Sequence, residues 1–283
     1  MGWKRLGCLL AFCVGATSAL AADNDDIARG LSAVNRGDNG EAIVFFSSAL
    51  ASGNLEPGLA QIAYYDRARA YMNEEECGSA VSDLTSAISL KPDNADGYMM
   101  RGRANRCAGR YADAITDYTE VIRLKPSGNA YWQRALARYN EGDFDGAATD
   151  SSAAMLFAPK WPYPLLWFSI ARMREGKFEA SDLAGKTDLI DMNTWPGQVF
   201  LLYKGDATPD DILRAARVGD AKTVRDNMCE ANFYLAEWWL AKNGVETARP
   251  LLEDVRDNCR HDFIEYSAAG AELGRLNGNT HAY

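Results

Sequence analysis

The thiols of the chain are the first residues whose type and spacing could do chemistry. Four cysteines follow the first 21 residues: Cys77, Cys107, Cys229 and Cys259. No two of them have Cys-x-x-Cys spacing, and the only histidines are His261 and His281. A metal site or a nucleophile–base pair needs more convergent ligands than these. Two structural disulfides and four buried thiols are the interpretations left open, and an even count in an exported chain favours disulfides.

A second pattern pairs opposite charges. Three arginines are each followed sixteen residues later by an aspartate: Arg67 and Asp83, Arg101 and Asp117, Arg134 and Asp150. If each arginine lies on one helix and its aspartate on the antiparallel neighbour, the two can meet within one helical hairpin. We therefore expect a structural ladder of ion pairs that fixes helix register. An earlier copy has Phe45 in place of the acid, so Arg29 needs another partner.

The usual catalytic motifs are missing from the sequence. It has no glycine-rich phosphate loop after a strand and no G-x-S-x-G. No sequence feature places two carboxylates in one dry pocket, as carboxylate catalysis would require. We expect no enzyme, no cofactor and no metal, and a hydrolase hidden between residues 161 and 205 is the remaining alternative.

The elements that must position these residues form a repeat. The three arginines of the ladder are 34 and 33 residues apart, and Ala80, Ala114 and Ala147 keep the same spacing, as do Pro92, Pro126 and Pro159. Each unit reads as a helix, a turn, a second helix and a proline stop, with small residues where the helices cross. This is similar to the tetratricopeptide repeat (TPR) pattern. It implies an all-α solenoid of helical hairpins, a right-handed superhelix with a C-terminal capping helix.

The domain organisation follows from where the repeat is clear and where it fades. From Trp161 the period weakens, and it returns at Cys229. We expect a signal peptide (1–21), a divergent repeat (22–58), three repeats (61–94, 95–127, 128–160), a degenerate helical hairpin (161–190), an irregular and short-helix connection (191–228), a TPR-like repeat (229–261), and a capping helix with a tail (262–283).

The N-terminus and the charge bear on location. Lys4 and Arg5, an apolar stretch and the small-x-small sequence Ala19-Leu20-Ala21 predict an export signal. The context of the two early cysteines does not favour lipidation, so we expect a soluble periplasmic protein without a lipid anchor or membrane span. A net charge of −9 with no basic stripe argues against nucleic-acid binding.

The C-terminal half resembles a known family. Three segments carry the resemblance: Trp195 with Tyr203-x-Gly205, Cys229-Glu230-x-Asn232-Phe233-Tyr234-Leu235, and His261-Asp262-Phe263-Ile264-Glu265-Tyr266. They look like the NlpI-type TPR proteins of bacterial envelopes. The resemblance implies a dimeric, non-catalytic adaptor that recruits a processing protease and peptidoglycan hydrolases. A chaperone-like assembly or secretion factor that binds extended peptides is the alternative within the same architecture.

The inner, concave face of the repeats is the predicted partner site. Aromatic, methionine and arginine residues favour protein contacts. Positions of the first helices select Tyr65, Arg69, Met72, Asn73, Met99, Arg103, Arg106, Trp132, Leu136, Tyr139 and Asn140. The same layout places Cys229 beside Cys259 and Cys77 on the same edge as Cys107, which predicts one disulfide from each pair.

Overall fold

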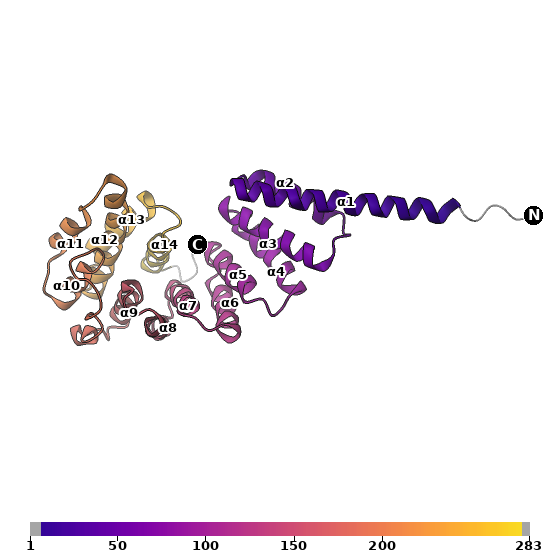
Figure 1. Ribbon diagram of the computed structural model, residues 1–283. Coiled ribbons are helices and arrows are strands. Elements are labelled where there is room, and N and C mark those ends of the chain that lie inside the picture. Colours follow the sequence, from indigo (N-terminus) through magenta and orange to yellow (C-terminus); the bar gives the residue numbers. More distant parts are fainter. Residues whose placement is uncertain (1–6, 279–283) are drawn as a thin grey trace, which may run out of the picture. The chain divides into compact units, whose positions relative to one another are not determined.

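The computed structural model describes residues 7–278 (Figure 1), and all regular structure in that range is helical. The chain divides into two compact units, Met1–Ala108 and Gly109–Tyr283, and each is described by itself. The first unit contains α1 (Gly7–Arg36), α2 (Asn39–Ala51), α3 (Pro57–Asn73), α4 (Cys77–Leu90) and α5 (Ala95–Cys107). The second contains α6 (Tyr111–Leu124), α7 (Gly128–Glu141), α8 (Phe144–Phe157), α9 (Pro162–Arg174), the 3-10 helix η1 (Ala180–Leu183), α10 (Gln198–Lys204), α11 (Pro209–Ala216), α12 (Ala221–Ala241), α13 (Val245–Asn258) and α14 (Ile264–Leu276).

Helical hairpins form where the sequence predicts them. Gly142 ends α7 with a φ of 93°, a left-handed conformation that glycine adopts without strain. Asp143 then caps α8 by accepting a hydrogen bond from the Gly146 N–H at 2.9 Å. The helices α4, α6 and α8 each end two residues before a proline. The solenoid of TPR-type hairpins is therefore confirmed.

Small residues bring the two helices of a hairpin together. The four alanines at the predicted crossing position of the second helices are at most 2% exposed: Ala42, Ala80, Ala114 and Ala147. In the first hairpin, a Cβ on Gly30 would lie 2.7 Å from the Phe46 ring, closer than real carbon atoms approach. Since α1 and α2 pack against each other there, a larger residue at position 30 would force them apart.

The core of the second unit is aromatic and joins distant parts of the chain. The Trp167 ring stacks on Phe233 with centroids 5.5 Å apart and meets Tyr139 edge-on at 5.0 Å. These residues belong to α9, α12 and α7, and all are at most 2% exposed. The predicted C-terminal helix is α14, which packs against α13, against α12 and also against α7 (Figure 1).

Two sequence expectations in this unit are wrong in detail. The segment 161–190 is not a helical hairpin, because only α9 forms and the rest is irregular apart from η1. Leu183 and Ile190 still pack into the core, but Gly185 between them has a φ of 73°, outside a right-handed helix. The repeat expected to begin at Cys229 begins earlier, because Asp220 caps α12 by accepting from the Thr223 N–H at 2.8 Å.

Residues 191–228, predicted to be an irregular connection with a short helix, agree more closely with the prediction. The short apolar helix α10 ends at Gly205, whose φ is 85°. Thr208 and Asp211 form a reciprocal capping box at the start of α11.

Of the predicted signal peptide, residues 1–6 lie outside the described part, and residues 7–21 form the beginning of α1. Among the described residues, no helix is both long and apolar enough to cross a bilayer.

Candidate functional site

The arginine–aspartate ladder has a bidentate rung in each unit. The Arg67 Nε and Nη2 atoms donate to the two Asp83 carboxylate oxygens, both at 2.7 Å. Arg134 donates to Asp150 in the same way at 2.8 and 2.7 Å. The hydrogen bonds donated to the carboxylates raise the pKa of both arginines, since a paired guanidinium is harder to deprotonate. These pairs are largely buried and join the two helices of one hairpin.

The same arginines also reach the preceding repeat. Arg67 Nη1 donates to Ser47 Oγ on α2 at 2.9 Å, and Arg134 Nη1 donates to Thr119 Oγ1 on α6 at 3.0 Å. Each guanidinium lies 5.8 Å from the ring centroid of the tyrosine three residues earlier. Each arginine therefore connects its own helix to the second helix of the same hairpin and to the last helix of the preceding repeat. The sequence pattern did not reveal the contact with the preceding repeat.

Two other arginines occupy this position of the repeat. Arg101 donates to Thr85 Oγ1 at 3.2 Å, and its pairing with Asp117, a residue of the second unit, stays a prediction. Arg29, which lacks the aspartate, pairs instead with Asp25 at 2.9 Å and lies 5.6 Å from the Phe45 ring.

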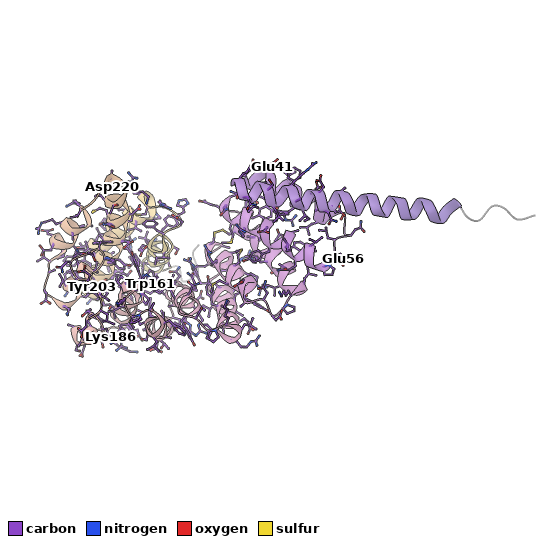
Figure 2. The ribbon with its side chains drawn as sticks, in the orientation of Figure 1. Glu41, Glu56, Trp161, Lys186, Tyr203 and Asp220 are labelled. Atoms are coloured by element: carbon purple, nitrogen blue, oxygen red, sulfur yellow. A yellow bond between two sulfur atoms is a disulfide. The ribbon has the colours of Figure 1, made fainter. Side chains whose placement is uncertain are left out.

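Both predicted disulfides are present, one in each unit. The Cα atoms of Cys77 and Cys107 are 5.9 Å apart, and those of Cys229 and Cys259 are 5.8 Å apart. The first bridge joins the start of α4 to the end of α5, and the second joins α12 to the residue after α13. A yellow sulfur–sulfur bond is visible in Figure 2. No group of three or more acids, histidines and cysteines in the described range could hold a metal.

The predicted concave-face residues of the first unit lie on α3 and α5 and are accessible. Arg69, Asn73 and Arg103 are exposed, and Tyr65, Met72, Met99 and Arg106 are partly exposed. Tyr65 lies among four charges, Asp66, Arg69, Asp96 and Arg103, so the faces of the two helices are adjacent. Burial, followed by the acids, raises the pKa of the Tyr65 hydroxyl, which therefore remains a hydrogen-bond donor. This surface has an aromatic ring and exposed arginines, the residues that protein interfaces favour.

The four concave-face residues predicted in the second unit do not form an accessible surface. Trp132, Leu136, Tyr139 and Asn140 are between 0% and 5% exposed. The last helix α14 covers Tyr139 and Asn140: Tyr139 Oη donates to Glu272 at 2.9 Å, and Asn140 Nδ2 donates to Ser267 Oγ at 3.3 Å. The Trp132 ring packs against Trp161 and Trp167. The prediction that these four residues form an open partner-binding surface is therefore wrong, because the chain's own side chains bury them.

A buried charge cluster fastens that helix. Glu272 accepts from Arg275 at 2.6 Å and pairs with Arg174 of α9 at 3.1 Å, and Glu237 of α12 lies 3.9 Å from Arg174. Both glutamates are 0% exposed. Burial, reinforced by the charge of Glu272, raises the pKa of Glu237 to about 8. This cluster lies inside the fold and binds helices to one another rather than a ligand.

A cavity of about 230 Å³ opens elsewhere in the second unit. Its lining comes from α7, from the start of α9, from α12 and from the start of α14, and includes Trp132, Trp161, Tyr163, Glu230, Phe263 and Glu265. Trp161, at the edge of α9, is 37% exposed and is labelled in Figure 2. Its aromatic walls and two acids make this cavity a candidate binding site.

Hydrogen bonds hold both carboxyls of the cavity in place. Glu230 accepts from the Tyr163 hydroxyl at 3.0 Å and from the Trp195 indole N–H at 2.9 Å, while Glu265 accepts from the Tyr234 hydroxyl at 3.0 Å. Burial raises the pKa of both acids, and the charge of Glu230 helps to raise that of Glu265 to about 8. A carboxyl with such a pKa can give or hold a proton near neutral pH, and its ionised form attracts a cation.

The sequence did not predict this cavity, although Glu230 and Glu265 belong to the C-terminal motifs described above. Glu230 and Glu265 are 35 residues apart and belong to different helices, and Trp132 comes from a third. No local spacing connects them. The glutamate within each of these two motifs was the available signal of a buried polar site. A glutamate among aromatic residues on a buried helix face needs a hydrogen-bond partner.

Comparison with known proteins agrees with the repeat architecture. The tetratricopeptide repeat family model matches residues 65–129 and 108–162. The fold is similar to a crystal structure of a tetratricopeptide repeat protein from Parabacteroides merdae ATCC 43184, with 14% identity over 89% of this chain and 99% of that one and a TM-score of 0.59. It is also similar to the MamA protein, with 18% identity over 55% of this chain and 84% of that one and a TM-score of 0.51. At these identities the likeness extends to the fold alone.

Proposed function

We propose that this chain, whose helices form TPR-type hairpins and whose residues 65–162 match the tetratricopeptide repeat model, is a non-catalytic scaffold that binds other proteins. The observation that carries the proposal is the accessible face of α3 and α5, where Tyr65 lies beside Arg69 and Arg103. An aromatic anchor with flanking arginines offers contact area and charge-assisted hydrogen bonds to a partner.

The finer form of the proposal concerns location and partners. We place the protein in the periplasm and take its partners to be a processing protease or peptidoglycan hydrolases of the envelope. The export-type N-terminus, the two disulfides and the resemblance of the C-terminal motifs support this assignment. Dimer formation is part of the same assignment, and sedimentation of the purified protein tests it.

The experiment is capture of partners from a periplasmic extract by the disulfide-intact protein, with mass spectrometry of what is retained. We expect near-stoichiometric recovery of an envelope protease or cell-wall hydrolase. The variant Arg69→Ala/Arg103→Ala should lose that partner. The matched control Arg36→Ala/Lys91→Ala removes the same charge from the same unit and should keep it. Unchanged capture by a folded Arg69→Ala/Arg103→Ala variant would refute the assignment of the α3–α5 face.

Two alternatives give different results in the same experiment. A chaperone-like factor that binds extended peptides would retain many unrelated chains rather than one partner. A hydrolase is the other alternative, and the paired acids of the cavity are the observation in its favour. It requires hydrolysis of a cell-wall or peptide substrate that Glu265→Gln abolishes while the fold is kept.

A further inference from the structure

The cavity of the second unit combines two features that are seldom used for packing alone. Its walls present the rings of Trp132, Trp161 and Tyr163, which meet one another at 5.0 and 6.1 Å between centroids. Glu230 and Glu265 lie in the same lining. Three aromatic residues and two acids therefore line the same cavity.

The acids of the cavity have donors but no cation. Among the described residues, the groups that act on Glu230 and Glu265 are the hydroxyls of Tyr163 and Tyr234, the indole of Trp195 and the charge of Asp226. Arg260 lies 5.4 Å from the Phe263 ring near the entrance, but its guanidinium pairs with Asp262 at 2.9 Å. Burial raises the pKa of both acids, and the charge of Glu230 raises that of Glu265 further, a cost that a bound cation would remove.

We propose that this cavity binds the ammonium group of a lysine side chain on a partner protein, with Glu230 and Glu265 receiving the charge and the rings of Trp161 and Tyr163 packing along the alkyl stem. Aromatic faces attract cations through their quadrupoles, and the attraction grows where water is excluded. The inference rests on the proposed scaffold function and names the chemistry that a partner would present to the second unit.

Lysine fits the donors and acceptors better than arginine does. A guanidinium prefers the open fork of a free carboxylate, where two parallel hydrogen bonds can form. Glu230 has no open fork, because Tyr163 and Trp195 already donate to its two oxygens. An ammonium is a compact charge with three donors that can use the remaining lone pairs. At about 230 Å³ the cavity exceeds the ~10–15 Å³ that a site for one water requires, so it has room for an alkyl chain.

The probe is Nα-acetyl-lysine N-methylamide, whose side-chain ammonium is free. Its binding to the intact protein is measured by titration calorimetry and by the shifts of the indole N–H signals in NMR spectra. The neutral analogue N-acetyl-norleucine methylamide has the same stem without the charge. We expect the lysine probe to bind at least about tenfold more tightly, as hydrogen bonds to charged groups usually allow. Equal binding of the two probes, or no binding of the lysine probe up to about 20 mM, would overturn the proposal.

The matched variants are Glu230→Gln, which removes the charge and keeps one of the two acceptor oxygens, and Glu246→Gln, which makes the same change at an exposed position of α13. Only Glu230→Gln should weaken lysine binding, by about tenfold. Thermal unfolding checks that each variant is folded. Should Glu230→Gln fail to fold, Trp161→Ala removes a partly exposed wall and should weaken binding in its place. Unchanged binding by either folded variant contradicts the assignment.

A further arm tests the source of the cation. Choline carries a free quaternary ammonium, and binding about tenfold tighter than that of the lysine probe would assign the cavity to a small molecule and refute the lysine assignment. Because these titrations contain no partner protein, their failure is distinguishable from failure of the capture experiment. Lysine binding that persists when Arg69→Ala/Arg103→Ala abolishes capture would confirm that the two surfaces act separately.

Discussion

The Tyr139 hydroxyl donates a hydrogen bond to Glu272 Oε1 at 2.9 Å across a sequence separation of 133 residues. It joins α7, which a simple solenoid would leave open on its inner face, to the final described helix α14. Arg275 reinforces the contact by donating to the Asn140 carbonyl at 2.9 Å. The inner face of α7 at Tyr139 and Asn140 is thus filled from within, and a partner must bind elsewhere.

Replacing Glu272 with alanine should destabilise the second unit by about 3 to 5 kcal/mol, because Arg174 and Arg275 would keep their charges without the carboxylate that both contact. Tyr139→Phe removes one neutral donor and should cost about 1 to 2 kcal/mol. Chemical denaturation followed by tryptophan fluorescence measures both. The exposed Glu141→Ala serves as control and should change little. A Glu272→Ala effect no larger than that of Tyr139→Phe would contradict the assigned role of the cluster.

The ladder gives a prediction for the first unit. Arg67→Ala should destabilise it by about 3 kcal/mol, because the buried Asp83 carboxylate would lose both charged donors. Arg69→Ala removes an exposed ion pair with Asp66 and should cost under about 1 kcal/mol. The free energy of unfolding from urea titration compares the two. If the ladder fixes register rather than adding stability, Arg67→Met/Asp83→Leu should recover most of the loss, and failure to recover would show that the pair itself is stabilising.

Stability should fall as pH rises from the unfolded glutamate pKa of 4.5 to the folded value of about 8 for Glu237. In that window the folded state holds a proton that the unfolded state has released. The free energy of unfolding therefore falls by up to about 1.4 kcal/mol per pH unit. Glu265 has the same direction and a similar value. Below pH 4.5 both glutamates are protonated in the folded and the unfolded state, so neither changes the free energy of unfolding with pH. Melting temperatures measured at intervals through the window should decline for the wild type and decline less for Glu237→Gln. A flat profile for the wild type would refute the prediction.

Each disulfide should stabilise only its own unit. The two bridges close loops of the same sequence separation, 30 residues, so loop entropy predicts about 3 to 4 kcal/mol for each. Cys77→Ser/Cys107→Ser should lower the stability of the first unit, and Cys229→Ser/Cys259→Ser that of the second. Because the pairs lie in different units, their effects should add in the fourfold variant. Hydrogen exchange of helices α4 and α12 distinguishes the units, and a loss of protection shared by both after one pair is removed would contradict independence.

The repeat architecture was predictable because it depends on local spacing. Recurring Arg, Ala and Pro positions identify the hairpins, and sixteen residues between arginine and aspartate predict the contact that Arg67 makes with Asp83. The segment after Gly176 was misinterpreted because Gly176-Lys177-Phe178 resembles Gly142-Asp143-Phe144, the turn and helix start of an earlier hairpin. Its apolar residues Leu183 and Ile190 contact the core from irregular backbone, which no period marks.

The residues of the candidate sites likewise divide into those that repeat spacing predicts and those that only tertiary packing brings together. Arg69 and Arg103 were found because their position within a repeat decides their exposure. Tyr139 was assigned to an open face because a repeat pattern describes only neighbouring hairpins, whereas the Glu272 that covers it lies 133 residues later. The cavity acids Glu230 and Glu265 were missed for the same physical reason, since tertiary packing of α12 and α14 brings them together.

The position of α14 has a consequence for how the protein is made. In an ordinary repeat array each hairpin can fold when the next one leaves the ribosome, since contacts are between neighbours. Here Tyr139 and Glu272 cannot meet until about 130 further residues have been synthesised. The nascent second unit therefore exposes the inner face of α7 through most of its translation, and its last folding step is a long-range closure of the kind that slows folding and invites aggregation.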